Sequence, residues 1–387
     1  MEEAMTSRVA AEAFAPGEYL KDELDERGWT QDEFATMIGR SPAVVNQIIS
    51  GKRGVSPETA SEIGAALGTS AIYWMNLDSA YRLWHIERKA SKLSLISQEA
   101  RIRERFPVRE MVKRGWIDPS ANAEVLEAQI KSFFGIGDLD ETPRLAHAAK
   151  KTGYPQDITG TQRAWLFRVK QVAEAMTVRP YSERALREAI PELNALRTAA
   201  EDIRRVPHIL AECGVRFVIV EHVPASKIDG VCLWLGEKTT TPVIGMSLRL
   251  DRIDNFWFVL RHEIEHVLNK HGREEAIVDS DVQDTSTTDQ ARELPEEEKI
   301  ANHAAADFCV PEADMADFVL RHRPLFSEEK VLNFASRMQV HPGLVVGQLQ
   351  RRANNYRLFR KYLVSIRSII APVATTDGFG QIVALTA

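Results

Sequence analysis

The chain has 387 residues, of which 44% are hydrophobic and 27% are charged, with a formal net charge of -6. A chain of this size can bury more than one core, so we expect two or three domains, and its negative charge argues against a protein that coats nucleic acid through bulk charge. No apolar run reaches the roughly 18–20 residues of a membrane span, which argues against a membrane protein. The first residues are acidic and polar, which argues against a signal peptide. We therefore expect a cytoplasmic protein.

The segment from Gly17 to His85 predicts five short helices. The second begins at Thr30, which with Glu33 three residues later forms a capping box. The third begins at Ser41-Pro42 and ends at Gly51, the arrangement favoured at the two ends of a helix. Two helices joined by a tight turn at Gly39 lie inside this all-α segment, and the arrangement resembles the helix-turn-helix of DNA-binding proteins.

The third of these helices is expected to read DNA, because the second helix of such a motif lies in the major groove. By position, the predicted contacts with bases come from Ser41, Pro42, Ala43, Asn46 and Gln47, and those with phosphates from Arg40, Lys52 and Arg53. Residues 1–85 hold seven Lys and Arg against 13 Asp and Glu, so nonspecific affinity is expected to be low and a homodimer to be needed. The alternative is a domain that mainly dimerises or holds a partner.

After this domain, the spacing of the apolar residues is first helical and then alternating. From about 86 to 205 apolar residues recur at helical spacing, and Leu126 and Ile130 are typical of such a buried face. After Gly214 the pattern alternates, and residues 215–223, 230–236 and 241–248 predict three strands. An acidic, Ser/Thr-rich stretch over 279–297 predicts a mobile loop, and the three cysteines lack any C-x-x-C spacing and are expected in the core.

The segment R-H-E-I-E-H at 261–266 predicts a zinc site. His262 and His266 stand four residues apart, which places both imidazoles on one stripe of a helix. Zinc accepts such nitrogen ligands, and a catalytic zinc site keeps one position for water. Glu263 lies next to the first histidine and is the expected general base. The alternative is a pair of histidines that are solvated, or satisfied without a metal.

The third ligand must come from elsewhere, since Asn269 and Gly272 occupy the positions of an extended H-E-x-x-H-x-x-G-x-x-H site. His271 lies about 180° round a continuous helix from His262, so we expect it to favour the helix C-terminus rather than bind metal.

A second helix offers a carboxylate for this position. Glu298 shares a face with Asn302, Ala305 and Cys309 at helical spacing, and the small residues there allow a close approach of the two helices. Glu298 is therefore the expected ligand. Asn302 is expected to orient one of the histidines by contacting it, without binding the metal itself. Glu296 and Glu297 compete as ligands, but they lie out of phase with that face.

A basic stretch over 351–367 has six Lys and Arg and no acidic residue. It could bind phosphates, although such charge on a helix more often marks a solvated face.

These residues resemble two known families. H-E-I-E-H at 262–266 with E-K-I-A-N-H-A-A-A-D-F-C-V-P at 298–311, and the strands before them, resemble the ImmA/IrrE family of zinc metallopeptidases over about 150 residues. The front, through W-T-Q-D-E-F-A and G-K-R-G-V-S-P-E-T-A, resembles HigA-type antitoxins with an Xre/Cro helix-turn-helix over about 70 residues. The chain departs from the first pattern at Glu265, where relatives commonly have glycine, and at Ala304, where they often have phenylalanine.

The resemblance implies an α+β chain that combines a DNA-binding regulator of the toxin-antitoxin or stress and phage-response type with a zinc-dependent peptidase. Its substrate would be a protein, such as a repressor, a toxin or the chain itself. The alternative is a non-catalytic regulator whose peptidase-like domain is a sensor or binds a toxin. We expect a flexible start (1–15), the helix-turn-helix domain (16–85), a helical connecting region (86–200), a zincin-like domain with a small β-sheet (201–350), and a basic helix and tail (351–387).

Overall fold

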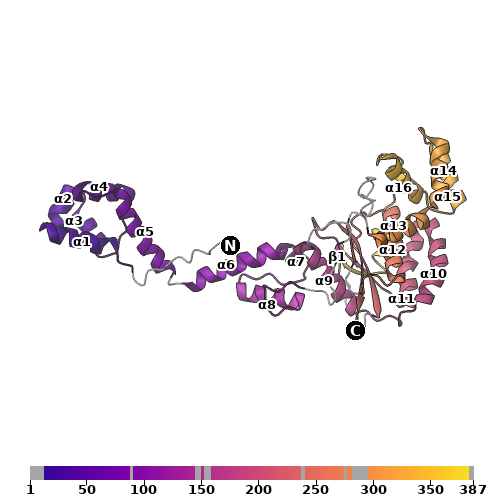
Figure 1. Ribbon diagram of the computed structural model, residues 1–387, viewed down its shortest axis with the longest axis horizontal. Helices are drawn as coiled ribbons and strands as arrows, with labels where there is room; N and C mark the ends of the chain where they lie inside the picture. The colour runs from indigo at the N-terminus through magenta and orange to yellow at the C-terminus, as the bar shows by residue number, and fades with distance from the viewer. Residues whose placement is uncertain are drawn as a thin grey trace. The chain divides into compact units, whose positions relative to one another are not determined.

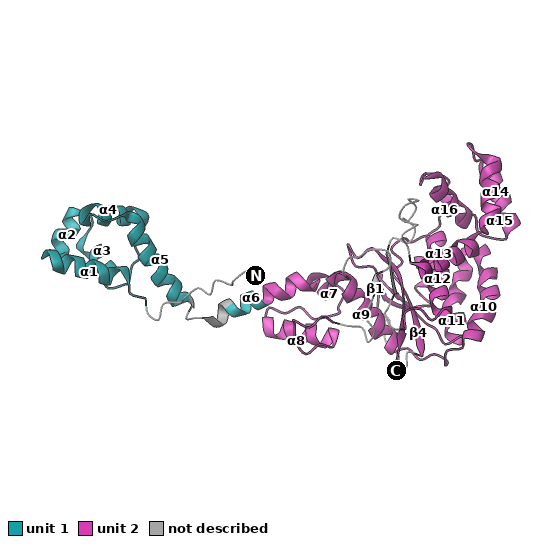
Figure 2. Ribbon diagram, viewed as in Figure 1, with its two compact units in different colours: residues 1–98 teal, residues 99–387 magenta. Residues whose placement is uncertain are grey.

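The computed structural model divides the chain into two units, Met1–Gln98 and Glu99–Ala387, which are described separately (Figure 1, Figure 2). The structure describes residues 13–87, 90–143, 150–151, 158–236, 240–273, 277–280 and 295–382. The flexible start predicted for 1–15 therefore lies almost wholly outside the described residues, as does most of the loop predicted for 279–297. Among the described residues, no helix has both the length and the apolar character needed to cross a bilayer.

The N-terminal unit contains the five predicted helices. They are α1 (Pro16–Arg27), α2 (Gln31–Met37), α3 (Pro42–Ile49), α4 (Pro57–Leu67) and α5 (Ala71–Glu87). Their apolar faces meet in one small core around the fully buried side chains of Leu20, Phe34 and Ile63. The predicted capping box is present: the Thr30 hydroxyl accepts from the Glu33 N–H, and the Glu33 carboxylate accepts from the Thr30 N–H.

The C-terminal unit is built on a mixed seven-stranded sheet in the order β1-β5-β3-β4-β2-β6-β7. The strands are β1 (Lys150–Lys151), β2 (Arg216–Val220), β3 (Ile228–Leu235), β4 (Thr241–Met246), β5 (Ile277–Ser280), β6 (Thr375–Gly378) and β7 (Gln381–Ile382). β2, β3 and β4 are the three predicted strands. β3 pairs antiparallel with β4 and β5, while β2 pairs parallel with β4 and β6.

Twelve helices in the described part of the chain accompany the sheet or lead into it. They are α6 (Ala90–Arg105), α7 (Val108–Lys113), α8 (Ala123–Phe134), α9 (Gly160–Glu174), α10 (Glu183–Ala195), α11 (Val206–Glu212), α12 (Ile253–Leu268), α13 (Glu296–Cys309), α14 (Glu312–His322), α15 (Glu328–Met338), α16 (Pro342–Ala353) and α17 (Arg367–Ile370). Three 3-10 helices join some of them: η1 (Leu196–Thr198), η2 (Ala200–Arg205) and η4 (Arg360–Tyr362).

Both faces of the sheet are covered, because alternate strand residues point to opposite sides. Phe217 and Ile219 belong to the core shared with α10, α12, α13 and α16, whereas Val218 and Val220 belong to the core shared with α8 and α9. The central strands are therefore apolar on both faces rather than alternating between apolar and polar. Cys213, Cys232 and Cys309 are buried thiols, as expected for core residues.

The structure differs from the predicted domain organisation in two regions. The region 86–200 is not only a connector, because α9 covers one face of the sheet and the Trp165 indole N–H donates to the carbonyl of Val220 on β2 at 2.9 Å. The basic helix predicted over 351–367 is wrong as a continuous helix. α16 ends at Ala353 because Asn354 adopts the left-handed conformation, and the chain then continues through η4 and α17 into β6, which pairs with β2.

Candidate metal centre and nucleic-acid interface

Helix α12 is fixed by its apolar sides and carries two of the predicted ligands. Phe256, Val259 and Ile264 are fully buried in the core against the sheet. The helix start is held by Arg252, which pairs with the carboxylate of Asp254. His262 and His266, one turn apart, are both fully buried and their rings lie 4.6 Å apart between centroids. A long buried helix of this kind holds side chains in place more firmly than a loop does.

Helix α13 packs along α12 and supplies the third residue. Ala301 and Ala305 are fully buried, and such small side chains allow close packing between helices. Glu298, on the first turn of α13, is 3% exposed, whereas Glu296 is exposed and pairs with Lys299. Of these two carboxylates, the structure places Glu298 beside the histidines.

The three side chains converge on one point. His262 Nε2 and His266 Nε2 are 2.9 Å apart, and the Glu298 carboxylate oxygens lie 3.4 Å from the first nitrogen and 3.2 Å from the second. Ligand atoms about 2.0–2.1 Å from a tetrahedral zinc ion are about 3.3 Å from one another. The His262, His266 and Glu298 group therefore fits a metal ion of this size, and its donor set of two nitrogens and one carboxylate matches a catalytic type of zinc site.

The charge of Glu298 supports this fit. Burial opposes ionisation of its carboxyl group, but the neighbouring His262 and His266 outweigh that effect and hold the pKa of Glu298 well below its ordinary value. A buried carboxylate that stays anionic favours a bound cation.

Glu263 lies on the side of α12 that faces strand β3. Its side chain is fully buried and packs against Gly230, where a Cβ atom would come within 2.0 Å of Glu263 Oε1. Glycine at 230 is therefore required for the carboxylate to occupy this place against strand β3.

The side chain that contacts a ligand histidine is His271 and not the predicted Asn302. The Asn302 side-chain oxygen is buried and has no hydrogen-bond partner among the described residues, so no contact there supports its predicted role in orienting a histidine. Instead, His271 Nδ1 lies 3.0 Å from His266 Nδ1. Burial, and secondarily the nearby His266, lower the pKa of His271 and favour its neutral form.

Sequence reasoning missed the contact of His271 because it assumed a continuous helix. α12 ends at Leu268, and Lys270 and Gly272 have positive φ angles of 61° and 77°. The turn brings His271 back toward His266. Gly272 was the available signal, since glycine commonly follows a helix end.

The Glu265 carboxylate is held by two neighbouring side chains and is not part of the three-residue group. It pairs with Arg261 at 2.7 Å and accepts from the Asn269 side chain at 2.9 Å. Burial would raise the pKa of Glu265, but Arg261 and Asn269 outweigh burial and lower it. The extra carboxylate is therefore neutralised locally and leaves the three-ligand group intact.

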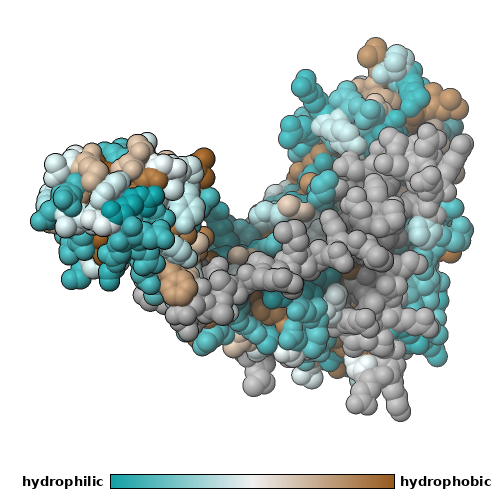
Figure 3. Space-filling view, turned by 60° about the vertical axis from the view of Figure 1, so that its left-hand side comes forward, coloured by the Kyte–Doolittle hydropathy of each residue, from teal (hydrophilic) through white to brown (hydrophobic). Residues whose placement is uncertain are grey.

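In the N-terminal unit, the predicted base-contacting residues share the exposed face of α3. Val45 and Ile48 point into the core, while the opposite face carries the exposed Ser41, Pro42, Ala43, Asn46 and Gln47. Ser41 occupies the N-cap position without a capping hydrogen bond, and the Asn46 side chain donates to Gln31 at 3.3 Å. The view in Figure 3 shows mainly hydrophilic side chains on this unit, with scattered apolar ones between them.

The three predicted phosphate contacts differ in their surroundings. Arg40 forms a bidentate ion pair with Glu62: its Nε and Nη2 atoms donate to the two carboxylate oxygens at 2.7 and 2.8 Å. This pairing offsets the charge of Arg40. Lys52 and Arg53 are exposed, and both backbone N–H groups donate to the Gln47 carbonyl, so their loop is folded onto the end of α3.

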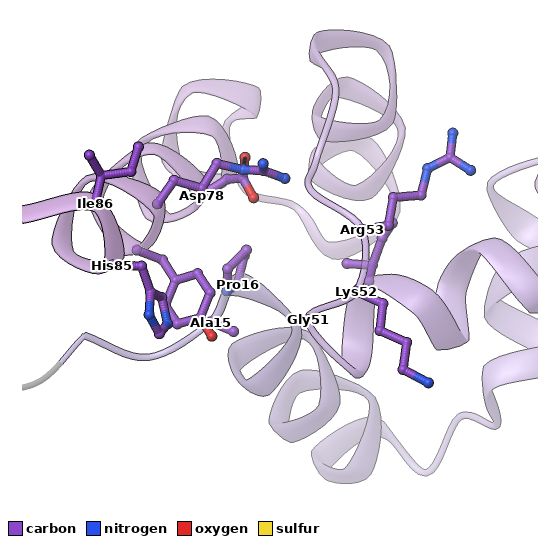
Figure 4. Close-up of a pocket in the computed structure, with 11 residues that line it drawn as sticks. Ala15, Pro16, Gly51, Lys52, Arg53, Asp78, His85 and Ile86 are labelled. Atoms are coloured by element: carbon purple, nitrogen blue, oxygen red, sulfur yellow. Dashed lines mark hydrogen bonds and ion pairs between the residues drawn. The ribbon is translucent and has the colours of Figure 1, made fainter. Parts of the chain in front are cut away.

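Lys52 and Arg53 also border a pocket of about 320 Å³ whose other side is formed by Tyr81, His85 and Ile86 of α5. Figure 4 shows the Lys52 and Arg53 side chains diverging from their loop and directed away from His85 and Ile86. Both cations are thus available at the surface beside α3.

Comparisons with known proteins match the helix-turn-helix segment of the N-terminal unit. Residues 20–74 match the helix-turn-helix family. The chain is 30% identical over 73 residues to the uncharacterized HTH-type transcriptional regulator YddM of Escherichia coli, covering 19% of this chain and 78% of that protein. It is 31% identical over 85 residues to the virulence-associated protein I of Dichelobacter nodosus, covering 22% and 79%.

Among solved structures, it is similar to the Pseudomonas aeruginosa antitoxin HigA with the higBA promoter, at 35% identity over 21% of this chain and 90% of that chain, with a TM-score of 0.21. It is also similar to an antidote protein of a plasmid maintenance system from Nostoc punctiforme, at 27% identity over 22% and 92%, with the same TM-score of 0.21.

Proposed function

The chain belongs, through its N-terminal unit, to the helix-turn-helix family of transcriptional regulators, and on this premise we propose that it joins operator binding to a zinc-dependent peptidase in its C-terminal unit. The observation that carries the second half is the buried group of His262, His266 and Glu298, whose nitrogen and oxygen atoms lie 2.9–3.4 Å from one another and could hold a metal ion. The resemblance of residues 262–266 and 298–311 to the ImmA/IrrE family also supports a zinc-dependent peptidase.

The DNA-binding half of the proposal assigns base reading to the exposed face of α3. Asn46 and Gln47 can each form paired hydrogen bonds with adenine, and Ala43 can contact a thymine methyl group. Lys52 and Arg53 supply phosphate contacts, whereas Arg40 contributes less because Glu62 neutralises it. With so few cations, operator binding would require a homodimer that engages two half-sites.

The peptidase half assigns a role to each buried side chain. His262, His266 and Glu298 would hold the metal. Zinc bound there would supply a Lewis acid that polarises a carbonyl group and activates water. Glu263 would accept the proton from that water and return it to the leaving amine, since it follows His262 directly in the sequence and its carboxylate is fixed in place against Gly230. The substrate would be a protein, such as a repressor, a toxin or the chain itself.

A second candidate function is a regulator that senses metal, or binds a toxin, without cleavage. The burial of the site favours it, because His262, Glu263 and His266 are all fully buried and a peptide must reach Glu263 to be cleaved. In this case zinc binding would change the regulator's affinity for DNA or for a protein partner, and Glu263 would have no chemical role.

Replacing Glu263 by glutamine separates the two functions. The proposed peptidase predicts that E263Q binds zinc like the wild type but does not cleave a protein encoded beside this gene, or the chain itself, in a mass-spectrometric assay of incubated mixtures. Equal cleavage by both chains would exclude Glu263 as the base. Zinc-dependent DNA binding that is the same in both chains, with cleavage by neither, would establish the sensor instead.

A further inference from the structure

We propose that His271 is a positioning residue of the metal centre, which fixes the ring of His266 and keeps its Nε2 atom available as a ligand. The inference rests on the proposed zinc site and adds a residue that is not itself a ligand. His271 is not part of the group of His262, His266 and Glu298 that could hold a metal ion.

The first support is that the His266 ring is held at both nitrogens. Its Nε2 atom faces the site, at 2.9 Å from His262 Nε2 and 3.2 Å from Glu298 Oε1. Its Nδ1 atom lies 3.0 Å from His271 Nδ1, a hydrogen-bond distance. The ring therefore cannot rotate without losing the contact to His271.

The second support is that the backbone holds His271 firmly in this place. Its N–H donates to the His266 carbonyl at 2.9 Å, and its own carbonyl accepts from the Trp234 indole N–H at 2.7 Å. At the next residue, Gly272 has a φ of 77°, and a Cβ atom there would lie 2.7 Å from the Cys232 carbonyl oxygen. The loop is thus docked on strand β3 by contacts that do not involve the His271 side chain.

The third support is the position of the proton shared by His266 and His271. Only one proton fits between two Nδ1 atoms at 3.0 Å, so one ring donates and the other accepts. If His266 gives the lone pair of Nε2 to a metal, its proton is on Nδ1, and His271 must be the acceptor. Metal-binding histidines generally use the second ring nitrogen in this way, and the partner orients the ring.

The test compares two substitutions at His271 that differ in whether an acceptor remains. His271→Leu removes the acceptor. His271→Asn keeps a side-chain oxygen near the position of Nδ1, and neither change affects the backbone contacts to Trp234. His303→Leu is the matched control, because His303 is an exposed histidine on the neighbouring helix α13.

Zinc affinity is measured on the full chain by competition with a chelator, and the visible spectrum of the cobalt-loaded chain reports the ligand geometry. We expect His271→Leu to bind zinc about 10–100-fold more weakly and to change the cobalt spectrum. Losses of this size are typical when a residue that hydrogen-bonds to a metal ligand is replaced. His271→Asn should recover most of the affinity, and His303→Leu should match the wild type.

Nitrogen NMR of histidine in the zinc-loaded wild type adds a test that needs no variant. It should show His266 protonated at Nδ1. Wild-type zinc binding by His271→Leu, or an asparagine variant as weak as the leucine variant, would overturn the role of His271 alone. Protonation at Nε2 would exclude that atom as a ligand and would overturn the role of His271 and the assignment of His266 as a ligand together. A wild-type chain that binds neither zinc nor cobalt would overturn the zinc site and this inference together.

Discussion

Substitution of Gly230 by alanine tests the placement of Glu263. The added Cβ would lie 2.0 Å from Glu263 Oε1 and 2.9 Å from Val259 Cγ1, far inside normal contact distances. Glu263 and Val259 are both fully buried, so neither can move into solvent to relieve the contact. Overpacking of this kind costs about 1–3 kcal/mol, and we expect G230A to lower the free energy of unfolding by that amount.

The assay is urea unfolding of the zinc-loaded full chain, with the transition of the C-terminal unit identified by release of the metal. Gly137→Ala is the control, because the nearest atom to its added Cβ is the flexible carboxylate end of Glu141 at 3.3 Å. This control should change stability by less than about 0.5 kcal/mol.

A double variant shows whether the Glu263 side chain causes the loss. Truncation to alanine removes the atom that the new Cβ meets, so G230A should cost less in an E263A chain than in the wild type, by at least about 0.5 kcal/mol. Equal stability of G230A and wild type, or an equal cost of G230A with and without the Glu263 carboxylate, would refute the packing of Glu263 against β3.

Three further predictions concern both units. Alanine at Asn46 and Gln47 should weaken operator binding in a fluorescence anisotropy assay by about 1–3 kcal/mol for each lost base contact, and unchanged affinity would indicate a dimerisation domain instead. Glu62→Gln should release Arg40 for phosphate contact and steepen the salt dependence of DNA binding by about one unit in a salt titration, whereas an unchanged slope would mean that Arg40 lies away from the DNA. In metal-free protein, the pKa of Glu298 is lower in the folded state than in the unfolded state, so its carboxylate stabilises the fold above about pH 4 and this contribution is lost as the pH falls. Urea unfolding between about pH 5 and 3 should therefore show a smaller loss for Glu298→Gln than for the wild type, and equal losses would contradict the ionised buried carboxylate.

The elements that the sequence predicted well are those whose determinants are local. The helix-turn-helix segment carries its own caps and turns, such as Thr30 with Glu33 and the glycine at 39, and its five helices are present. The three central strands lie where they were predicted, although they are apolar on both faces rather than alternating between apolar and polar residues. Glu298 could be selected because helical spacing and small neighbours are properties of one short segment.

The elements that the sequence did not predict depend on distant partners. β6 has the sequence T-T-D-G and becomes a strand only because β2 offers it a free edge. The segment 351–367 has the composition of a basic helix, but the left-handed Asn354 and Phe359 interrupt it. The contact of His271 with His266 depends on a turn that docks on β3, which helical spacing cannot reveal.

The central claim, a zinc ion held by His262, His266 and Glu298, is tested most directly by X-ray absorption at the zinc edge of the purified full chain. The account predicts one zinc per chain, with two imidazole nitrogens and oxygen ligands at about 2.0–2.1 Å, and loss of this signal when both histidines are replaced by alanine. A chain purified without zinc and unable to take it up, a zinc ion bound through sulfur, or a signal that survives the double replacement would contradict it.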